Sequence, residues 1–86
     1  MSEEKYESYL IDAIILVKTK LGQVWNVANE AKKIEGVQFA KAVAGRYDVV
    51  VHAKTDRLSY VIARIHEIKG IESTETQIAL EDRLGR

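Results

Sequence analysis

The feature that most constrains the fold of this chain is an internal repeat with an offset of 34 residues. The segments "IEGV" (34–37) and "IKGI" (68–71) match at this offset, and so do apolar residues upstream of each. In both copies the upstream residues follow the i, i+3, i+4, i+7 spacing of one apolar helix face. They are Val24, Val27, Ala28, Ala31 and Ile34 in the first copy, and Leu58, Val61, Ile62, Ile65 and Ile68 in the second. The chain therefore holds two copies of one structural unit.

Each copy has the pattern of a strand, a helix, a glycine and a second strand. Gly36 and Gly70 stand where a left-handed glycine commonly ends a helix. Gly22 and Asp56, at equivalent positions, are residue types that cap helix N-termini. Gly45 leaves too few residues between the second and third strands for anything but a hairpin. We expect strands at 9–19, 37–44, 46–54 and 71–80, and helices at 22–35 and 56–69.

Two such units joined by a hairpin predict an α+β fold, the ferredoxin-like βαββαβ plait. Right-handed crossovers place both helices on one face of a four-stranded antiparallel sheet and leave the other face open. We expect a single domain over residues 1–86, with its core at about 9–81. A chain of this length buries only a modest core, so self-association is the expected source of further burial.

Alternation along the strands predicts which residues lie on the open face. In strands one and three, one alternate set is uninterrupted and apolar and should face the helices. The opposite set is apolar in the middle and charged toward the ends, whereas a solvated face would be polar throughout. Exposed apolar residues that cluster in this way mark an interface. The interface residues that we expect are Ile14, Leu16, Val50 and His52.

The composition excludes several classes of function. Thirteen basic and thirteen acidic residues give a net charge of zero, which argues against a dedicated nucleic-acid binder. The chain has no cysteine, so thiol catalysis and cysteine-based metal sites are excluded. No apolar run approaches the ~20 residues of a membrane span, and the first residues do not resemble a signal peptide. We expect a cytoplasmic protein with no membrane partner and no direct contact with nucleic acid.

A search for catalytic motifs finds none. The sequence lacks a phosphate-binding glycine loop and the His-Glu-x-x-His pattern, and its two histidines, His52 and His66, fall in different elements. We therefore expect no catalytic residue, no metal site and no cofactor. Trp25, in the first turn of helix one, is expected to be partly buried at the edge of the core.

The clearest sign of a site is an acid at the start of strand three. Asp48 corresponds to Ile14 in the repeat, so the scaffold accepts an aliphatic residue there, and an acid is costly unless it is hydrogen-bonded. Two interpretations remain open: Asp48 ties down the hairpin through nearby backbone N–H groups, or it anchors a small polar ligand beside Gly45. Strand four adds polar residues where the first copy has "FAKAV" (39–43). They are Ser73, Thr74, Thr76 and Gln77.

Taken together, "AIILVKTKLG", the helix ends "IEGV" and "IKGI", "GRYDVVV" and "STETQIAL" resemble the effector domain of the Lrp/AsnC transcription regulators, the RAM domain. The resemblance covers about residues 9–81. It implies a plait of the dimeric α/β-barrel type, which dimerises through its sheet and assembles into rings. It also implies that an amino acid or related small metabolite binds near the hairpin. The matching positions are Gly45, Tyr47 and Asp48, with Ser73, Thr74, Thr76 and Gln77 in strand four.

Full-length members of that family carry an N-terminal helix-turn-helix domain, and about eight residues precede strand one here. The resemblance thus implies a stand-alone effector domain that acts together with full-length Lrp/AsnC regulators. Two other functions stay open. One is a small cofactor-free enzyme of the dimeric ferredoxin-like class, which needs polar residues around a cavity between helices and sheet. The other is a purely structural assembly module.

Overall fold

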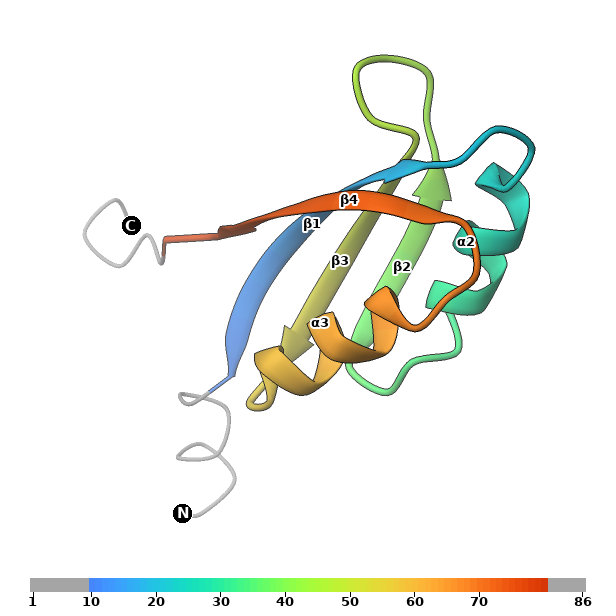
Figure 1. The fold of residues 1–86 in the computed structure, drawn as a ribbon. Coiled ribbons are helices and arrows are strands. Elements are labelled where there is room, and N and C mark those ends of the chain that lie inside the picture. Colours follow the sequence, from blue (N-terminus) through green and yellow to red (C-terminus); the bar gives the residue numbers. More distant parts are fainter. Residues whose placement is uncertain (1–9, 81–86) are drawn as a thin grey trace, which may run out of the picture.

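The structure, a computed structural model, describes residues 10–80 and has the element order β1–α2–β2–β3–α3–β4 (Figure 1). The expected start of strand one at residue 9 and the expected end of the core at residue 81 lie outside the described residues. The strands are β1 (Ile11–Thr19), β2 (Val37–Ala42), β3 (Val49–Thr55) and β4 (Ile71–Ile78). The helices are α2 (Val24–Ala31) and α3 (Leu58–His66).

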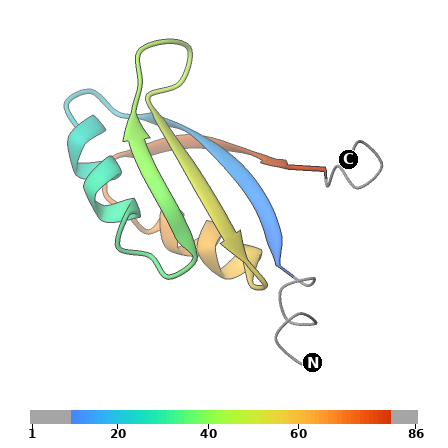
Figure 2. The same cartoon turned by 180° about the vertical axis from the view of Figure 1, so that it is seen from behind.

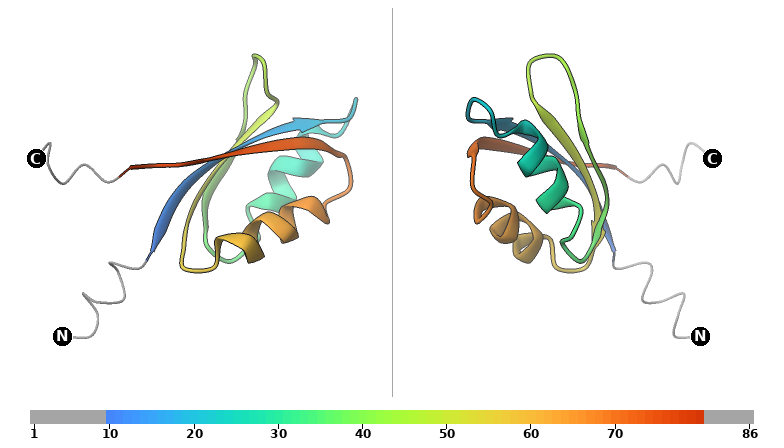
Figure 3. Two further views of the ribbon diagram at one scale, coloured as in Figure 1. Left: turned by 60° about the vertical axis from the view of Figure 1, so that its left-hand side comes forward. Right: turned by 90° about the vertical axis from the view of Figure 1, so that its right-hand side faces the viewer.

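The four strands form one sheet in the order β2-β3-β1-β4, and all neighbouring strands are antiparallel. Figure 2 shows the twisted sheet from behind, with β2 and β3 side by side. Both helices cover the same face of the sheet, and no helix within residues 10–80 covers the opposite face (Figure 3). The ferredoxin-like plait predicted from the repeat is confirmed.

The core lies between the helices and the two central strands. Alternate residues of β1 and β3 are completely buried, and they meet buried residues of both helices. Each large aliphatic side chain buried in this way contributes about 1.5–3 kcal/mol. The predicted alternation is thus confirmed. The buried apolar residues are Ala13, Ile15, Val17, Val49, Val51 and Ala53 in β1 and β3, and Val27, Ala28, Ala31, Val61 and Ile65 in the helices.

Backbone hydrogen bonds to the glycines that follow the two helices connect the repeat units. Gly36 and Gly70 have φ of +99° and +103°, a conformation that glycine adopts without steric cost. The N–H of Lys54 donates to the carbonyl of Gly36, and the N–H of Lys20 donates to the carbonyl of Gly70, both at 2.8 Å. Each bond joins the glycine of one copy to the end of the first strand of the other copy. The two copies therefore make equivalent contacts with each other.

The helix boundaries correct the predicted ones. The N-cap positions are Gln23 and Arg57, one residue later than Gly22 and Asp56, and neither makes a side-chain capping bond. At the second helix the hydroxyl of Thr55 accepts from the N–H of Arg57 at 2.9 Å and takes the place of a cap. Both helices are shorter than expected because their last turns tighten into i→i−3 bonds before the glycine.

The expected burial of Trp25 is wrong: its side chain is 71% exposed. The side of α2 that faces the core holds Val24, Val27 and Ala28. Trp25 follows Val24 directly, and one residue turns the side-chain direction by ~100° around a helix axis. Trp25 therefore points away from the core, and Leu21, in the turn before α2, is exposed as well.

Candidate functional site

The connection between β2 and β3 is a longer loop than the tight hairpin expected around Gly45. β2 ends at Ala42 and β3 begins at Val49, so residues 43–48 form a loop that stands out beyond the end of the sheet (Figures 1 and 3). The N–H of Val43 donates to the carbonyl of Asp48 at 2.9 Å and closes the base of the loop. Within the described part of the chain, the backbone N–H groups of residues 44–47 make no hydrogen bond. The loop tip thus presents several free donors.

Asp48 fastens this loop to the end of β1. Its Oδ2 accepts from the backbone N–H of Thr19 at 2.8 Å and from the Thr19 hydroxyl at 3.3 Å. The N–H of Asp48 also donates to the carbonyl of Val17 at 2.8 Å. Thr19 is buried, so the carboxylate satisfies polar groups that water does not reach. The structure therefore contains the hydrogen bonds that the anchoring interpretation predicts, while Oδ1 makes no hydrogen bond to any residue of the range 10–80.

Tyr47 joins the same loop to the far side of β1. Its hydroxyl donates to Oε1 of Glu75 in β4, and the amide of Gln77 donates to Oε2 at 3.3 Å. The hydrogen bond to Glu75 raises the pKa of Tyr47 above its ordinary value. The bonds from Tyr47 and Gln77 lower the pKa of Glu75. Both shifts favour a neutral phenol beside an ionised carboxylate, which is a charge-assisted hydrogen bond.

The four polar residues expected in strand four do not form one row. Thr74 and Thr76 pair with buried residues of β1 and lie on the helix side, where the Thr74 hydroxyl is 3.0 Å from Nε2 of His66. Ser73 and Gln77 pair with open-face residues of β1. Gln77 reaches the Tyr47–Glu75 hydrogen bond, whereas Thr74 and Thr76 face away from it. The structure thus brings together only part of the set that the sequence suggested.

The open face has the apolar centre that strand alternation predicts. Leu16 pairs with Val50, and Ile14 pairs with His52, so the four expected interface residues are neighbours on β1 and β3. All four are partly buried. Phe39 of β2 extends the patch, because its ring centroid lies 5.4 Å from that of His52. We call these five residues the open-face patch.

The rim of the open-face patch is charged. Nε2 of His52 pairs with a carboxylate oxygen of Asp12, and Nζ of Lys41 lies 5.0 Å from the centroid of the Phe39 ring. His52 therefore makes an ion-pair or hydrogen-bond contact at the surface. Among residues 10–80 no group of three side chains is placed to hold a metal ion.

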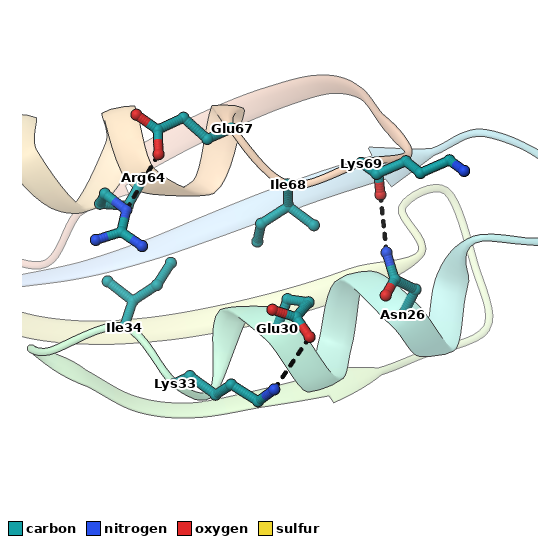
Figure 4. A pocket seen from close by; sticks show the side chains of 8 residues that line it. All are labelled: Asn26, Glu30, Lys33, Ile34, Arg64, Glu67, Ile68 and Lys69. Carbon is teal, nitrogen blue, oxygen red and sulfur yellow. Dashed lines mark hydrogen bonds and ion pairs between the residues drawn. The ribbon is translucent and has the colours of Figure 1, made fainter.

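A shallow groove of about 420 Å³ runs between α2 and α3 on the other side of the molecule (Figure 4). Its floor holds Ile34 and Ile68. Four of its charged residues form local i,i+3 pairs, Lys33 with Glu30 at 3.1 Å and Arg64 with Glu67 at 3.2 Å. Exposed pairs of this kind are typical of a solvated helix surface. None of the expected site residues lines the groove.

The loop and the open face can now be compared with known proteins. Residues 12–84 match the family model of the Lrp/AsnC ligand binding domain. The chain belongs to this family. It is 34% identical over 76 residues to the HTH-type transcriptional regulator FL11 of Pyrococcus abyssi, covering 85% of this chain and 50% of the regulator. The chain thus spans about half the length of the curated relatives it matches, which are transcription regulators.

Solved structures show the same fold. FFRP-DM1 is 30% identical with a TM-score of 0.73, and the match covers 81% of this chain and 99% of that one. The transcriptional regulator NMB0573 of Neisseria meningitidis, in complex with L-Met, has a TM-score of 0.74 at 17% identity. That match covers 96% of this chain and 57% of the regulator, and at this identity it shows the fold alone. No helix in the described part of the Lrp/AsnC domain is long and apolar enough to cross a membrane.

Sequence reasoning missed two residues that the structure places beside the loop: Thr19 and Glu75. Thr19 supplies both donors to Asp48, and Glu75 accepts from Tyr47. Glu75 had a detectable signal, because it lies between Ser73 and Gln77 on the same alternate row. Thr19 had none, because its partner is distant in the sequence.

Proposed function

We propose that this domain senses an amino acid or related small metabolite at the loop of residues 43–48 and assembles through its open face. The observation that carries the proposal is the protruding loop with free backbone N–H groups beside a carboxylate, in a chain of the Lrp/AsnC ligand-binding family. The L-Met complex of a regulator with the same fold supports an amino acid as the ligand class.

The chemistry of the loop suits a zwitterion. A cluster of unpaired backbone N–H groups attracts an anion such as the α-carboxylate of an amino acid. Asp48 holds its position through Oδ2, and its free Oδ1 is available to an ammonium group. Gly45 at the tip adds no side chain that would block the approach of a ligand. Of the polar residues in β4, Gln77 and Ser73 lie on the face toward which Tyr47 reaches.

The open-face patch supports assembly. Ile14, Leu16 and Val50 are apolar, adjacent and uncovered by any element of the described chain. A second copy laid on this face would bury them, and a stable interface buries about 1,200–2,000 Å² in total. A ligand regulates such a protein when it binds one assembly state more tightly than another. Mixed assembly with full-length Lrp/AsnC regulators would then link ligand binding by this domain to DNA binding by the regulators.

The experiment measures thermal stability and sedimentation of the purified domain with each of the twenty amino acids. A ligand at ~100 times its dissociation constant stabilises the fold by about 2.7 kcal/mol, and we expect at least one amino acid to do so. Replacing Asp48 with Asn should weaken that shift, while Asp56→Asn, at an exposed position away from the loop, should leave it unchanged. If no amino acid changes stability or assembly, the sensing role is wrong and a purely structural assembly role remains.

An enzymatic function has less support. An enzyme of the dimeric plait class needs polar residues around a cavity between the helices and the sheet, and Ile15, Val17, Val49 and Val51, at the centre of the helix-facing side, are apolar and fully buried. His52 lies on the opposite face, paired with Asp12.

A further inference from the structure

Glu75 lies where the candidate ligand loop and the open face meet. It belongs to β4, yet its hydrogen-bond donor Tyr47 belongs to the loop that precedes β3. We propose that the Tyr47–Glu75 hydrogen bond is a strap that positions the loop of residues 43–48 and couples it to a second copy of this chain bound on the open face. Glu75 is then a positioning residue. The coupling to a second copy rests on the proposed function, whereas the strap itself does not.

The strand order requires the strap to cross β1. The order is β2-β3-β1-β4, and Leu16 of β1 pairs with Val50 on one side and with Glu75 on the other. A Tyr47 side chain that reaches Glu75 therefore spans β1 close to Leu16. Leu16 is a member of the open-face patch, so a second copy that covers the patch must lie against the strap.

The loop has two attachments of different character. Asp48 bonds to the buried Thr19, so this attachment is sheltered from water. Tyr47 and Glu75 meet at the surface, where water competes for both partners. Exposed hydrogen bonds of this kind open easily, and they become stronger when a partner excludes water. We therefore expect the strap to be open part of the time in the free domain and closed when the open face is covered.

Closure of the strap orders the part of the loop that carries the free N–H groups. A ligand that needs those groups in place binds the closed loop better, so it favours the assembled form. By thermodynamic linkage, assembly favours the ligand to the same extent. The Tyr47–Glu75 bond thus supplies a physical connection between the two halves of the proposed function.

Amide hydrogen exchange at Val43 and Asp48, the two loop amides that are hydrogen-bonded, is followed by NMR and tests this without a ligand. In Tyr47→Phe and in Glu75→Ala we expect several-fold faster exchange of these two amides than in the wild type. Glu75→Gln keeps a carbonyl acceptor for the phenol and should restore part of the protection. The double variant Tyr47→Phe/Glu75→Ala should exchange no faster than either single variant, because both remove the same bond.

The matched control is Glu72→Ala, which removes an exposed carboxylate of β4 that makes no bond within the described chain. It should leave loop exchange at the wild-type rate. Raising the wild-type concentration until the domain self-associates should slow loop exchange further, and this slowing should be lost in Tyr47→Phe.

Two outcomes separate the strap from the proposed function. Wild-type exchange rates in Tyr47→Phe and Glu75→Ala at low concentration would overturn the strap. A wild type that stays monomeric at all concentrations would overturn the proposed assembly and the coupling with it, while the low-concentration exchange would still decide whether the strap exists.

Discussion

Asp48 shows how one residue can have a structural role and still be a candidate for ligand binding. Its carboxylate takes the backbone N–H and the hydroxyl of the buried Thr19, and this explains why the second copy of the repeat has an acid where the first has Ile14. One carboxylate oxygen satisfies the end of β1, and the other is free of bonds to the described chain.

Asp48→Ala should therefore destabilise the fold. It leaves the buried N–H and hydroxyl of Thr19 without an acceptor, which costs about 1–3 kcal/mol. For a domain of this size each kcal/mol lowers the melting temperature by roughly 4–8 °C. Urea unfolding followed by circular dichroism measures the change. Asp56→Ala, a control at an exposed position, should stay within about 0.5 kcal/mol of the wild type. Equal midpoints for the two variants would contradict the anchoring role.

The Tyr47–Glu75 bond predicts a pH window for the strap. The folded-state pKa of Tyr47 is raised from 10.0. The contribution of the neutral phenol to folding stability is therefore complete below pH 10 and is lost as the pH rises through the folded-state pKa. The folded-state pKa of Glu75 is lowered from 4.5. The contribution of the ionised carboxylate to folding stability is therefore complete above pH 4.5 and is lost as the pH falls through the folded-state pKa. The strap should thus be closed most often at neutral pH.

Carbon-13 NMR of ring-labelled tyrosine measures this titration, with the Tyr47 signal assigned by its absence in Tyr47→Phe. We expect Tyr47 to ionise at higher pH in the wild type than in Glu75→Ala, where its pKa should return toward 10.0. An unchanged titration curve in Glu75→Ala would show that the two side chains do not interact in solution.

At the scale of elements, two glycines of similar conformation have different surroundings. Gly22 has φ of +83° and Gly70 has φ of +103°. A Cβ at position 22 would meet nothing within 4 Å, whereas a Cβ at position 70 would lie 2.4 Å from Cβ of Gln23. Gly70 therefore supplies close contact between the end of the second copy and the start of α2, in addition to its backbone conformation.

Gly70→Ala should consequently destabilise the domain more than Gly22→Ala. Both substitutions place a side chain in the left-handed region, which costs roughly 1–2 kcal/mol. Gly70→Ala adds a clash that moves the start of α2, and overpacking of this kind costs about 1–3 kcal/mol more. Thermal unfolding of the two variants side by side measures the difference. If both lose the same stability, the contact between Gly70 and Gln23 is less tight than it is in the structure.

At the scale of the whole molecule, the two faces of the sheet differ in how they are completed. One face is covered by both helices, and the residues of the central strands on it, such as Ile15 and Val51, are fully buried, while the open-face patch is only partly buried. Apolar clusters of this kind in small domains are usually covered by a partner.

Val50→Glu should abolish self-association without unfolding the domain. A charge in the centre of an apolar interface loses its hydration and gains no partner. We expect wild-type circular dichroism and, by sedimentation equilibrium, a monomer at concentrations at which the wild type is a dimer. Leu21→Glu, a control that charges an exposed apolar residue off the sheet, should still form a dimer. A dimer that survives Val50→Glu would place the interface elsewhere.

The sequence by itself determined the elements, the plait and the two faces of the sheet. These follow from patterns that are local or periodic: the helix-face spacing, the alternation in β1 and β3, and the glycines that repeat at 36 and 70. Family membership follows from the same segments. The positions that local patterns described least well were the helix starts and the hairpin, because capping and loop length depend on contacts with other elements.

Only the tertiary structure decided how the candidate site is assembled. Thr19 and Asp48 are 29 residues apart, and Tyr47 and Glu75 are 28 apart. Asp48 and Glu75 each had a signal of their own, but no local pattern shows which residue pairs with them, because each pairing depends on the strand order that places β1 between β3 and β4. The same order divides Ser73, Thr74, Thr76 and Gln77 between two faces. Periodicity fixes which way a side chain points from its own strand, but its partner is chosen only when the strands pair.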